Sequence, residues 1–545
     1  MPSTSADASP RQAEGVVGRL VMLLVGLALV LTVLLVMVRP RDANFDYRQV
    51  WVAAALVFAL AAAFLLTTET HRRCPKGSRT DAAAGREKGR SRVVHWVWAG
   101  ATSVAGGVAG VLLALPLRYA YGWDAAVVTG FSRQLSSAGT LSAYAQDYLS
   151  RYPNNVPLVA MMNVARSLGD GSDRGMYFAY VVANGVCLSI VLFLSFVLVR
   201  LLRGSAAAFL SQGVVFVLVG CSPWMAVPYT DFPAMPFVLA GVVLAVVASR
   251  RTHFGVRAGL AALAFALVGV AFVIKSTPAT TAVAFVVALL IFAIGRPRQS
   301  IGRLAVVGFV GLAAFGLSVT GTLAAADRVA HVSRDALDTS RTAPTTWWLA
   351  NGLTTSGSPS GRPYYGGYSP EMVNSSMHLS GQALQRWSDE RLTAQLHKMG
   401  PGGIAAFEIN KQAFNWGDGM FFVWGEGYDY QAKRLEEHGP VAAAVQSVQH
   451  PSGSHYRLRA SLTNGLWLAI LLWAGVGLLR APYRRPVLIL ALAVLGIAVF
   501  TLLFQGRSRY LFAYVPVVIA LASTVDPLRR RSSYSRLGRL AAPSG

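Results

Sequence analysis

The feature that most constrains this chain is a long apolar run that recurs almost throughout its 545 residues. An apolar stretch of about 18 residues or more is long enough to cross a lipid bilayer as a helix. Hydrophobic residues make up 54% of the chain and charged residues only 14%, whereas a soluble domain is roughly a quarter charged. The sequence therefore predicts an integral membrane protein.

The apolar runs predict helices and not a barrel, because they show no alternation between apolar and polar residues and lipid leaves helices as the other way to satisfy the backbone. The predicted fold class is thus an all-α polytopic membrane protein with about 12 transmembrane helices. The predicted spans are residues 18–38, 49–67, 94–116, 176–199, 206–222, 233–249, 258–276, 279–295, 304–324, 463–480, 486–504 and 511–526.

The basic residues predict which ends of the spans face the cytoplasm. The net charge is +24, and the lysines and arginines gather in every second loop. These loops and the tail are represented by residues 68–93, Arg200 and Arg203, Arg250 to Arg257, Arg296 to Arg303, Arg480 to Arg485, and Arg529 to Arg531. Under the positive-inside rule they lie in the cytoplasm, as do both termini. This pattern also explains the charge without nucleic acid as a partner.

The remaining loops are predicted to face outward. Residues 1–93 form a tail, a two-helix hairpin and a basic loop; residues 94–324 form a transmembrane core; and residues 463–545 form the last helices and tail. The first external loop, 117–175, contains a short apolar piece at 156–168, which we expect at the membrane interface. Residues 325–462 are long, polar and rich in aromatic residues, so we expect a folded, mixed extracytoplasmic loop domain.

Three cysteines, Cys74, Cys187 and Cys221, support neither a disulfide framework nor a cysteine zinc site. The abundance of arginine over lysine and of alanine is typical of a GC-rich bacterial genome. The expected location is therefore a bacterial inner (plasma) membrane, with the functional site on the extracytoplasmic side.

Two acids of the first external loop are candidates for catalysis. Asp124 follows the third span directly, where a carboxylate stays hydrated near the headgroups and could act as a general base. A solvated acid at a helix end is the alternative. Asp147 precedes Tyr152, Asn154 and Asn155, a run that predicts a turn and a helix N-terminus. That terminus is either an ordinary cap or a place for an anion.

Cations at the predicted outer face suggest a bound phosphate. Lys275 ends an apolar span and either reaches the headgroups or holds a lipid phosphate. Arg507 and Arg509, with Tyr510, lie in a predicted external loop, where the topology rule disfavours positive charge. A guanidinium group binds phosphate through bidentate hydrogen bonds, so a bound phosphate would explain these two arginines. Asp231 lies between two prolines at the outer end of a span, where a charge is expensive unless it has a function.

The long loop adds Lys411, Trp416 and Asp418, the last two within the sequence Asn415-Trp416-Gly417-Asp418-Gly419. Aromatic faces suit the apolar faces of sugars, although tryptophan is equally good core material.

In this order, these residues resemble the GT-C superfamily of membrane glycosyltransferases, and more closely the bacterial relatives of protein O-mannosyltransferases and of lipid A aminoarabinose transferases. The resemblance covers roughly residues 94–526. The matching pieces are Asp124, Tyr152-Pro153-Asn154-Asn155, Tyr229-Thr230-Asp231, Lys275-Ser276-Thr277, Lys411 with Trp416-Gly417-Asp418-Gly419, and Arg507-Ser508-Arg509-Tyr510.

The resemblance implies a polyprenyl-phosphate sugar as donor and an envelope glycan, lipid or protein as acceptor. Asp124 would then be the catalytic base, with Asp147 or Asp231 as a second acid. Lys275, Arg507, Arg509 and Tyr510 would hold the donor phosphate, and the remaining candidates would contact substrate. Ala125 departs from the adjacent acids of protein mannosyltransferases. No cofactor is implied with certainty, and a divalent metal stays open.

Two other classes of function remain open from the sequence. A lipid or sugar transporter would explain many spans, but it predicts internal repeats that the chain does not display. A non-catalytic subunit of envelope assembly would not require Asp124, Lys275 and Arg509 to converge.

Overall fold

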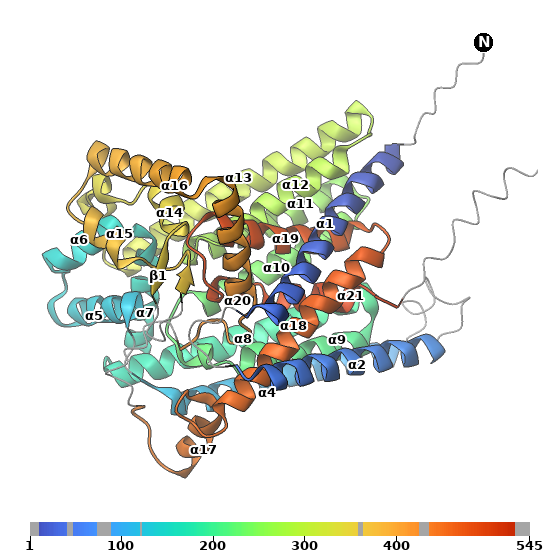
Figure 1. Ribbon diagram of the computed structural model, residues 1–545, viewed down its shortest axis with the longest axis horizontal. Coiled ribbons are helices and arrows are strands. Elements are labelled where there is room, and N and C mark those ends of the chain that lie inside the picture. Colours follow the sequence, from blue (N-terminus) through green and yellow to red (C-terminus); the bar gives the residue numbers. More distant parts are fainter. Residues whose placement is uncertain are drawn as a thin grey trace, which may run out of the picture.

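The computed structural model describes residues 10–40, 47–73, 89–119, 122–357, 363–424 and 435–528, and these residues are mostly helical (Figure 1). Within them, nine helices are long and apolar enough to cross a membrane. They are α1 (Pro10–Val38), α2 (Gln49–Arg73), α4 (Gly89–Ala114), α8 (Asp173–Arg203), α10 (Asp231–Ser249), α11 (Phe254–Ile274), α13 (Arg298–Val329), α18 (Tyr456–Arg480) and α19 (Arg485–Leu503).

Three further apolar helices are shorter than a span of that kind. They are α9 (Ser205–Val215) with the π-turn η3 (Phe216–Gly220), α12 (Ala279–Ala293), and α21 (Val515–Thr524). Every predicted span coincides with one of these helices, but the count of about 12 full-length spans is corrected to nine among the described residues. The short helices border irregular segments, namely η4 (Pro223–Ala226), residues 275–278, and the four-residue helix α20 (Arg509–Phe512). These segments carry or adjoin most of the candidate residues.

The N-terminal helix is part of the bundle because small residues let it approach closely. A Cβ atom at Gly26 of α1 would lie 2.9 Å from the carbonyl oxygen of Gly475 in α18, and the reverse is also true. Such close contact between backbones is how helices associate in lipid. Arg19 of α1 also donates to the carbonyls of Leu478 and Leu479.

The prediction of a mixed extracytoplasmic domain at 325–462 is wrong for the described residues. Its elements are η5 (Arg334–Ala336), η6 (Thr339–Arg341), α14 (Thr345–Gly352), β1 (Thr355–Gly357), β2 (Pro363–Tyr365), α15 (Pro370–Ser376), α16 (Gly381–Trp416) and α17 (Pro440–Gln449). The two strands form one small antiparallel sheet, with Thr355 opposite Tyr365.

The physical reason is that this region has only a very small hydrophobic core of its own. Its own buried apolar cluster contains only Trp347, Ala350, Met372 and Leu384. Trp416, Phe421 and Trp424 belong instead to the core of the bundle. The long helix α16 bends at Gly400 (φ 59°), directly before Pro401.

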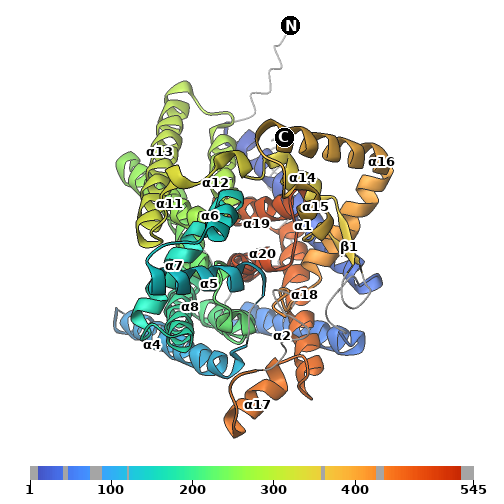
Figure 2. The same ribbon diagram turned by 90° about the vertical axis from the view of Figure 1, so that its left-hand side faces the viewer.

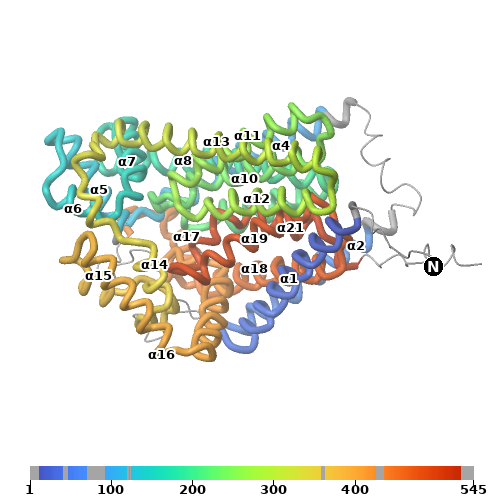
Figure 3. Tube along the Cα trace, turned by 90° about the horizontal axis from the view of Figure 1, so that it is seen from above, coloured from blue at the N-terminus to red at the C-terminus, as the bar shows by residue number. Residues whose placement is uncertain are grey.

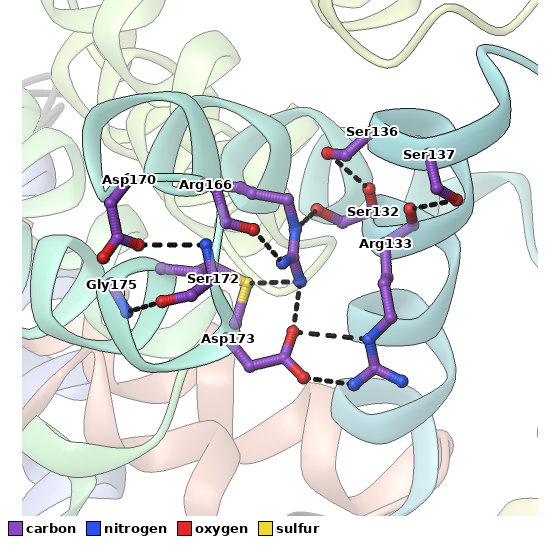
Figure 4. A network of polar contacts seen from close by, with 11 residues as sticks. Ser132, Arg133, Ser136, Ser137, Arg166, Asp170, Ser172, Asp173 and Gly175 are labelled. Carbon is purple, nitrogen blue, oxygen red and sulfur yellow. Dashed lines mark hydrogen bonds and ion pairs between the residues drawn. The ribbon is translucent and has the colours of Figure 1, made fainter.

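The first predicted external loop contains α5 (Trp123–Ala138), α6 (Ala143–Arg151), η2 (Pro153–Asn155) and α7 (Val156–Leu168). Arg166 of α7, which is 3% exposed, fixes this loop against the start of α8 (Figure 4). Its guanidinium donates to Ser132 Oγ of α5 at 3.0 Å and to Asp173 Oδ1 of α8 at 2.7 Å. The start of α5, where Asp124 lies, is therefore held on a rigid frame.

The predicted external loops and the basic, predicted cytoplasmic loops lie at different ends of the bundle (Figures 1 and 3). The helices α5, α6, α14 and α15 share one end, seen face-on in Figure 2. At the other end, Arg296 and Arg485 both donate to Glu14, and Arg250 donates to the carbonyl of Leu201. The predicted external loops thus share an end. Which side of the membrane it faces stays a prediction, and the basic residues at 74–88 and 529–531 lie outside the described residues.

Candidate functional site

The site begins at Asp124, in the first turn of α5, where Gly122 is the N-cap. Each oxygen of the Asp124 carboxylate accepts a hydrogen bond from a phenol. Tyr148 of α6 donates to Oδ1 at 2.6 Å, and Tyr229, just before α10, donates to Oδ2 at 2.7 Å. Both phenols are neutral donors, so they orient the carboxylate without neutralising its charge.

A second layer holds the phenol of Tyr148. Asn155 Nδ2, at the end of η2, donates to the Tyr148 hydroxyl at 2.8 Å, and the Tyr152 ring packs 5.2 Å from the Tyr148 ring. Burial, and then the charge of Asp124, raises the pKa of Tyr148 well above its usual range. The same causes raise the pKa of Tyr152 to about 12. Both hydroxyls therefore remain protonated donors near neutral pH.

Tyr229 connects the acid with the nearest cation. While its hydroxyl donates to Asp124, the centre of its ring lies 4.8 Å from the Arg509 guanidinium carbon. Arg509 begins α20, is 6% exposed, and also lies 5.1 Å from the Tyr510 ring. A guanidinium at this distance over an aromatic face is attracted to it. One side chain therefore contacts both the carboxylate and the cation.

Lys275 extends the cationic side. Its ammonium lies 4.9 Å from the Tyr510 ring centre and forms a buried ion pair with Asp231, the first residue of α10. The side chains of Lys275 and Asp231 are 5% and 1% exposed. Because Tyr510 lies against both Lys275 and Arg509, two of the predicted phosphate-binding cations flank one ring.

Arg507 lies two residues before Arg509 in the chain and is 2% exposed. Its guanidinium carbon is 4.6 Å from the Phe422 ring centre and 5.8 Å from that of Tyr364. The Arg507 guanidinium also comes within 3.8 Å of where a Cβ would stand at Gly367. The arginine is thus enclosed by aromatic faces and by the chain after β2.

A strained turn fixes the segment that carries the arginines. Phe421 and Phe422 adopt left-handed conformations with φ of 54° and 58°, which are costly for bulky residues. The Asp418 carboxylate stabilises the turn by accepting from the backbone N–H groups of Met420 and Phe422. It also accepts from Ser508 Oγ at 2.6 Å, between the two arginines.

The described contacts of Asp418 are those of an anchor within the fold, and its contact with substrate stays a prediction. It is 5% exposed, and the Tyr47 hydroxyl also donates to it. Burial raises the pKa of Asp418, and the hydrogen bonds that it accepts oppose that shift.

Tyr514 ties the Lys275 segment to the arginine segment. Its hydroxyl lies 2.9 Å from the hydroxyl oxygens of both Thr280 and Thr281, and it donates to the carbonyl of Thr277 at 3.1 Å. The break between α11 and α12 is thus anchored to the start of α21.

Two other candidates of the long loop are also structural. The fully buried Lys411 donates to the backbone carbonyls of Gly352 and Phe504 at 2.7 and 2.8 Å. Trp416 stacks on Trp467 with the ring centres 6.4 Å apart, inside the core. Lys411 holds the start of the arginine segment against α14, and Trp416 joins α16 to α18.

Asp147 lies apart from the hydrogen bonds of Asp124. It forms ion pairs with Arg151, one turn further along α6, and with Arg341 of η6. Asn154 is joined to Asn155 by a contact of 3.4 Å. The structure therefore brings most of the predicted site residues into one connected set, namely Asp124, Tyr152, Asn155, Asp231, Lys275, Arg507, Arg509 and Tyr510. Asp147 instead helps to pack α6 against η6.

Sequence reasoning missed the phenols that hold the acid. Tyr148 was not singled out, and Tyr229 entered only as part of a three-residue match. Their contacts with Asp124 span 24 and 105 residues, so no local pattern reveals them. The signal that the sequence offered was the position of Tyr148 and Tyr152 shortly after Asp147 in the first external loop.

Among the described residues, no group of three or more His, Cys, Asp or Glu side chains could hold a metal ion. The described side chains around Asp124 are phenols and an amide, which do not make a multidentate metal site. What they do make is an oriented carboxylate beside fixed cations, an arrangement suited to proton abstraction next to a leaving anion.

The chain belongs to a family described as a conserved hypothetical integral membrane protein, whose family model matches residues 16–528. The protein is therefore an integral, multi-pass membrane protein. No curated protein matches the chain.

Two solved structures have a distantly similar fold. One is ArnT from Cupriavidus metallidurans bound to undecaprenyl phosphate, with 11% identity and a TM-score of 0.35 over 80% of this chain and 77% of that one. The other is the oligosaccharyltransferase AglB from Archaeoglobus fulgidus in complex with an inhibitory peptide and a dolichol-phosphate. It has 12% identity and a TM-score of 0.37 over 81% of this chain and 53% of that one. Both likenesses are distant ones.

Proposed function

We propose that this protein transfers a sugar from a polyprenyl-phosphate donor to a cell-envelope acceptor. The observation that carries the proposal is the position of Tyr229, which donates to Asp124 and lies under Arg509. Tyr229 therefore contacts the Asp124 carboxylate with its hydroxyl and the buried Arg509 guanidinium with its ring, so that the two charged groups flank one position. A base next to an anion-binding group is what glycosyl transfer from a phosphate requires.

Asp124 acts as the general base in this proposal. An acceptor hydroxyl attacks the anomeric carbon of the sugar, a new C–O bond forms there, and the bond from that carbon to the phosphate oxygen breaks. The hydroxyl proton passes to Asp124, and the electron pair leaves with the polyprenyl phosphate. A single displacement of this kind inverts the anomeric centre. Base catalysis of this type contributes roughly 10²–10⁴-fold.

Arg507, Arg509 and Lys275, with Tyr510, bind the donor phosphate and stabilise the negative charge that it gains. Groups that are fixed before the reaction cost no reorganisation when the charge develops. The buried pair of Lys275 with Asp231 and the hydrogen bond from Ser508 to Asp418 provide that fixation.

The site belongs on the extracytoplasmic side of a bacterial plasma membrane in this proposal, with both termini in the cytoplasm. Its support is the clustering of loops 117–175 and 325–416 at one end of the bundle, away from the basic loops (Figure 1). A lipid-carried donor suits that side, because the polyprenyl chain stays in the bilayer while the sugar reaches the end of the bundle. Cell-wall or other envelope biogenesis is the corresponding process.

The test is transfer by the purified protein in liposomes that contain polyprenyl-phosphate sugars. Asp124→Asn should keep the fold and reduce the turnover rate by roughly 10²–10⁴-fold. The matched control is Asp170→Asn, an exposed acid of the same loop that caps Ser172 from a left-handed position, which asparagine tolerates. Transfer by Asp124→Asn at the rate of the control would refute the role of the base.

A further inference from the structure

Three aromatic residues in the neighbourhood of Asp124 differ from the core aromatics by being only partly covered. Tyr152 ends α6, Trp348 lies in α14, and Tyr368 lies between β2 and α15. Tyr368 is 39% exposed, and the other two are half-buried. By contrast, Trp347, the neighbour of Trp348, is 4% exposed and donates to Ser376 inside the small core.

The three residues reach from the base toward the cations. The Tyr152 ring lies 5.2 Å from the Tyr148 ring, whose hydroxyl donates to Asp124, and 6.5 Å from the Trp348 ring. At the other end, Tyr368 follows Gly367, which borders the Arg507 guanidinium. Burial, and then the charge of Asp124, raises the pKa of Tyr368, and the charge of Arg507 opposes that shift, which agrees with a position near both groups.

The place of these residues in the fold indicates a water-borne acceptor. Tyr152, Trp348 and Tyr368 come from the end of the bundle that α5, α6, α14 and α15 form (Figure 2), and none of them lies in a spanning helix. An acceptor that reaches Asp124 over them arrives from the aqueous side and not from within the bilayer.

The chemistry of the three residues favours a neutral, polyhydroxylated acceptor. Aromatic rings with a polar edge offer an apolar face together with a hydroxyl or N–H group. Asp147, the acid of the neighbouring turn, is already paired with Arg151 and Arg341, so no described acid of α6 remains to attract an amine. Sugars combine apolar C–H faces with hydroxyl groups and therefore match such a surface.

We infer that the acceptor is a saccharide chain, bound across Tyr152, Trp348 and Tyr368 with one hydroxyl directed at Asp124. This inference rests on the proposed function and deepens it, because it names the class of acceptor. The acceptor saccharide provides the attacking hydroxyl, and the donor phosphate leaves on the side of Arg507 and Arg509.

The test compares Trp348→Leu and Tyr368→Leu with the wild type and with a control. Tyr144→Leu is the control, because Tyr144 belongs to the same helix as Tyr148, is 63% exposed, and packs on Phe131. The acceptors are an octyl disaccharide, a serine- and threonine-containing peptide, and phosphatidylethanolamine in vesicles. Hydrolysis of the donor without acceptor is measured in parallel.

The expected result is transfer to the disaccharide, with its KM raised about tenfold by Trp348→Leu. Donor hydrolysis and kcat should stay near the wild-type values, and Trp348→Phe should restore most of the KM. Transfer to the peptide or to phosphatidylethanolamine in place of the disaccharide would overturn the inference, as would an unchanged KM in both leucine variants.

Direct binding of the octyl disaccharide separates this inference from the proposed function. Equilibrium binding should weaken about tenfold in Trp348→Leu and stay unchanged in Tyr144→Leu, whether or not the donor is turned over. A protein that binds the disaccharide in this way but does not use the donor would refute the proposed function and retain the saccharide site. Equal binding by Trp348→Leu and the wild type would refute the site alone.

Discussion

The acidic and cationic sides of the site are built in different ways. Asp124 is partly exposed, and it is held by hydroxyl groups that are neutral and can exchange partners. Lys275, Arg507 and Arg509 are buried, and they are held by an ion pair, by aromatic faces and by a strained turn. The difference suggests that the acid has to change its proton and its partners during the reaction, whereas the cations have to stay fixed.

The two sides also differ in how far their parts are separated along the chain. Tyr148 and Asn155 belong to the same loop as Asp124, and only Tyr229 comes from elsewhere. The cations need segments near residues 275, 418 and 508 to meet. Substitutions on the acidic side should therefore affect chemistry with little loss of stability, while those that anchor the cations should affect both.

After that of Asp124→Asn, the largest effect is expected on the cationic side, at Arg509. Arg509→Ala should lower the single-turnover rate of transfer by roughly 10²–10³-fold, because a fixed group that stabilises the leaving phosphate is lost. Arg509→Lys should recover only part of the rate, since an ammonium cannot reproduce the planar fork. Equal rates for the alanine and lysine variants would contradict a phosphate contact, provided that both proteins keep the wild-type melting temperature.

An intermediate effect is expected at the anchor Asp418. Asp418→Asn should destabilise the protein by about 1–3 kcal/mol, because the amide nitrogen cannot accept from buried donors. It should also raise the KM for the donor about tenfold, since Ser508 and the arginines beside it lose their anchor. Thermal unfolding and initial rates measure the two effects. A loss of stability with an unchanged donor KM would separate Asp418 from the site.

The smallest effect is expected at Tyr148. Burial and the charge of Asp124 raise the pKa of this phenol above the ordinary value of 10, so it stays protonated and donates throughout the range below about pH 10. Tyr148→Phe should therefore slow transfer by about fivefold, the loss of one hydrogen bond. The ratio of the two rates should stay constant between about pH 8 and pH 10. A ratio that falls toward one as the pH rises would show that Tyr148 itself titrates in that range.

The sequence predicts the spanning segments well, because an apolar run is a local property of the chain. It also singles out Asp124, since an acid directly after a span is visible without a structure. It assigns Arg507 and Arg509 to a phosphate and Lys411, Trp416 and Asp418 to substrate, but it does not reveal which of the five hold the fold together. All five are buried, and only the contacts show that the last three hold parts of the fold together, whereas Arg509 lies against Tyr229, the hydrogen-bond partner of Asp124.

The mixed domain predicted at 325–462 failed for a related reason. Aromatic residues in a polar loop indicate a core, but the sequence does not reveal whose core they enter. Most of those after α16 pack into the bundle, and this packing brings the turn at Phe421 and Phe422 to the arginines.

The most direct test of the central claim is an experimental structure of the protein with bound polyprenyl phosphate. The account predicts phosphate oxygens within hydrogen-bonding distance, about 2.7–3.2 Å, of the guanidinium of Arg509 or Arg507, on the side of Tyr229 opposite Asp124. A phosphate bound at the other end of the bundle, among the basic loops near Glu14, would contradict it.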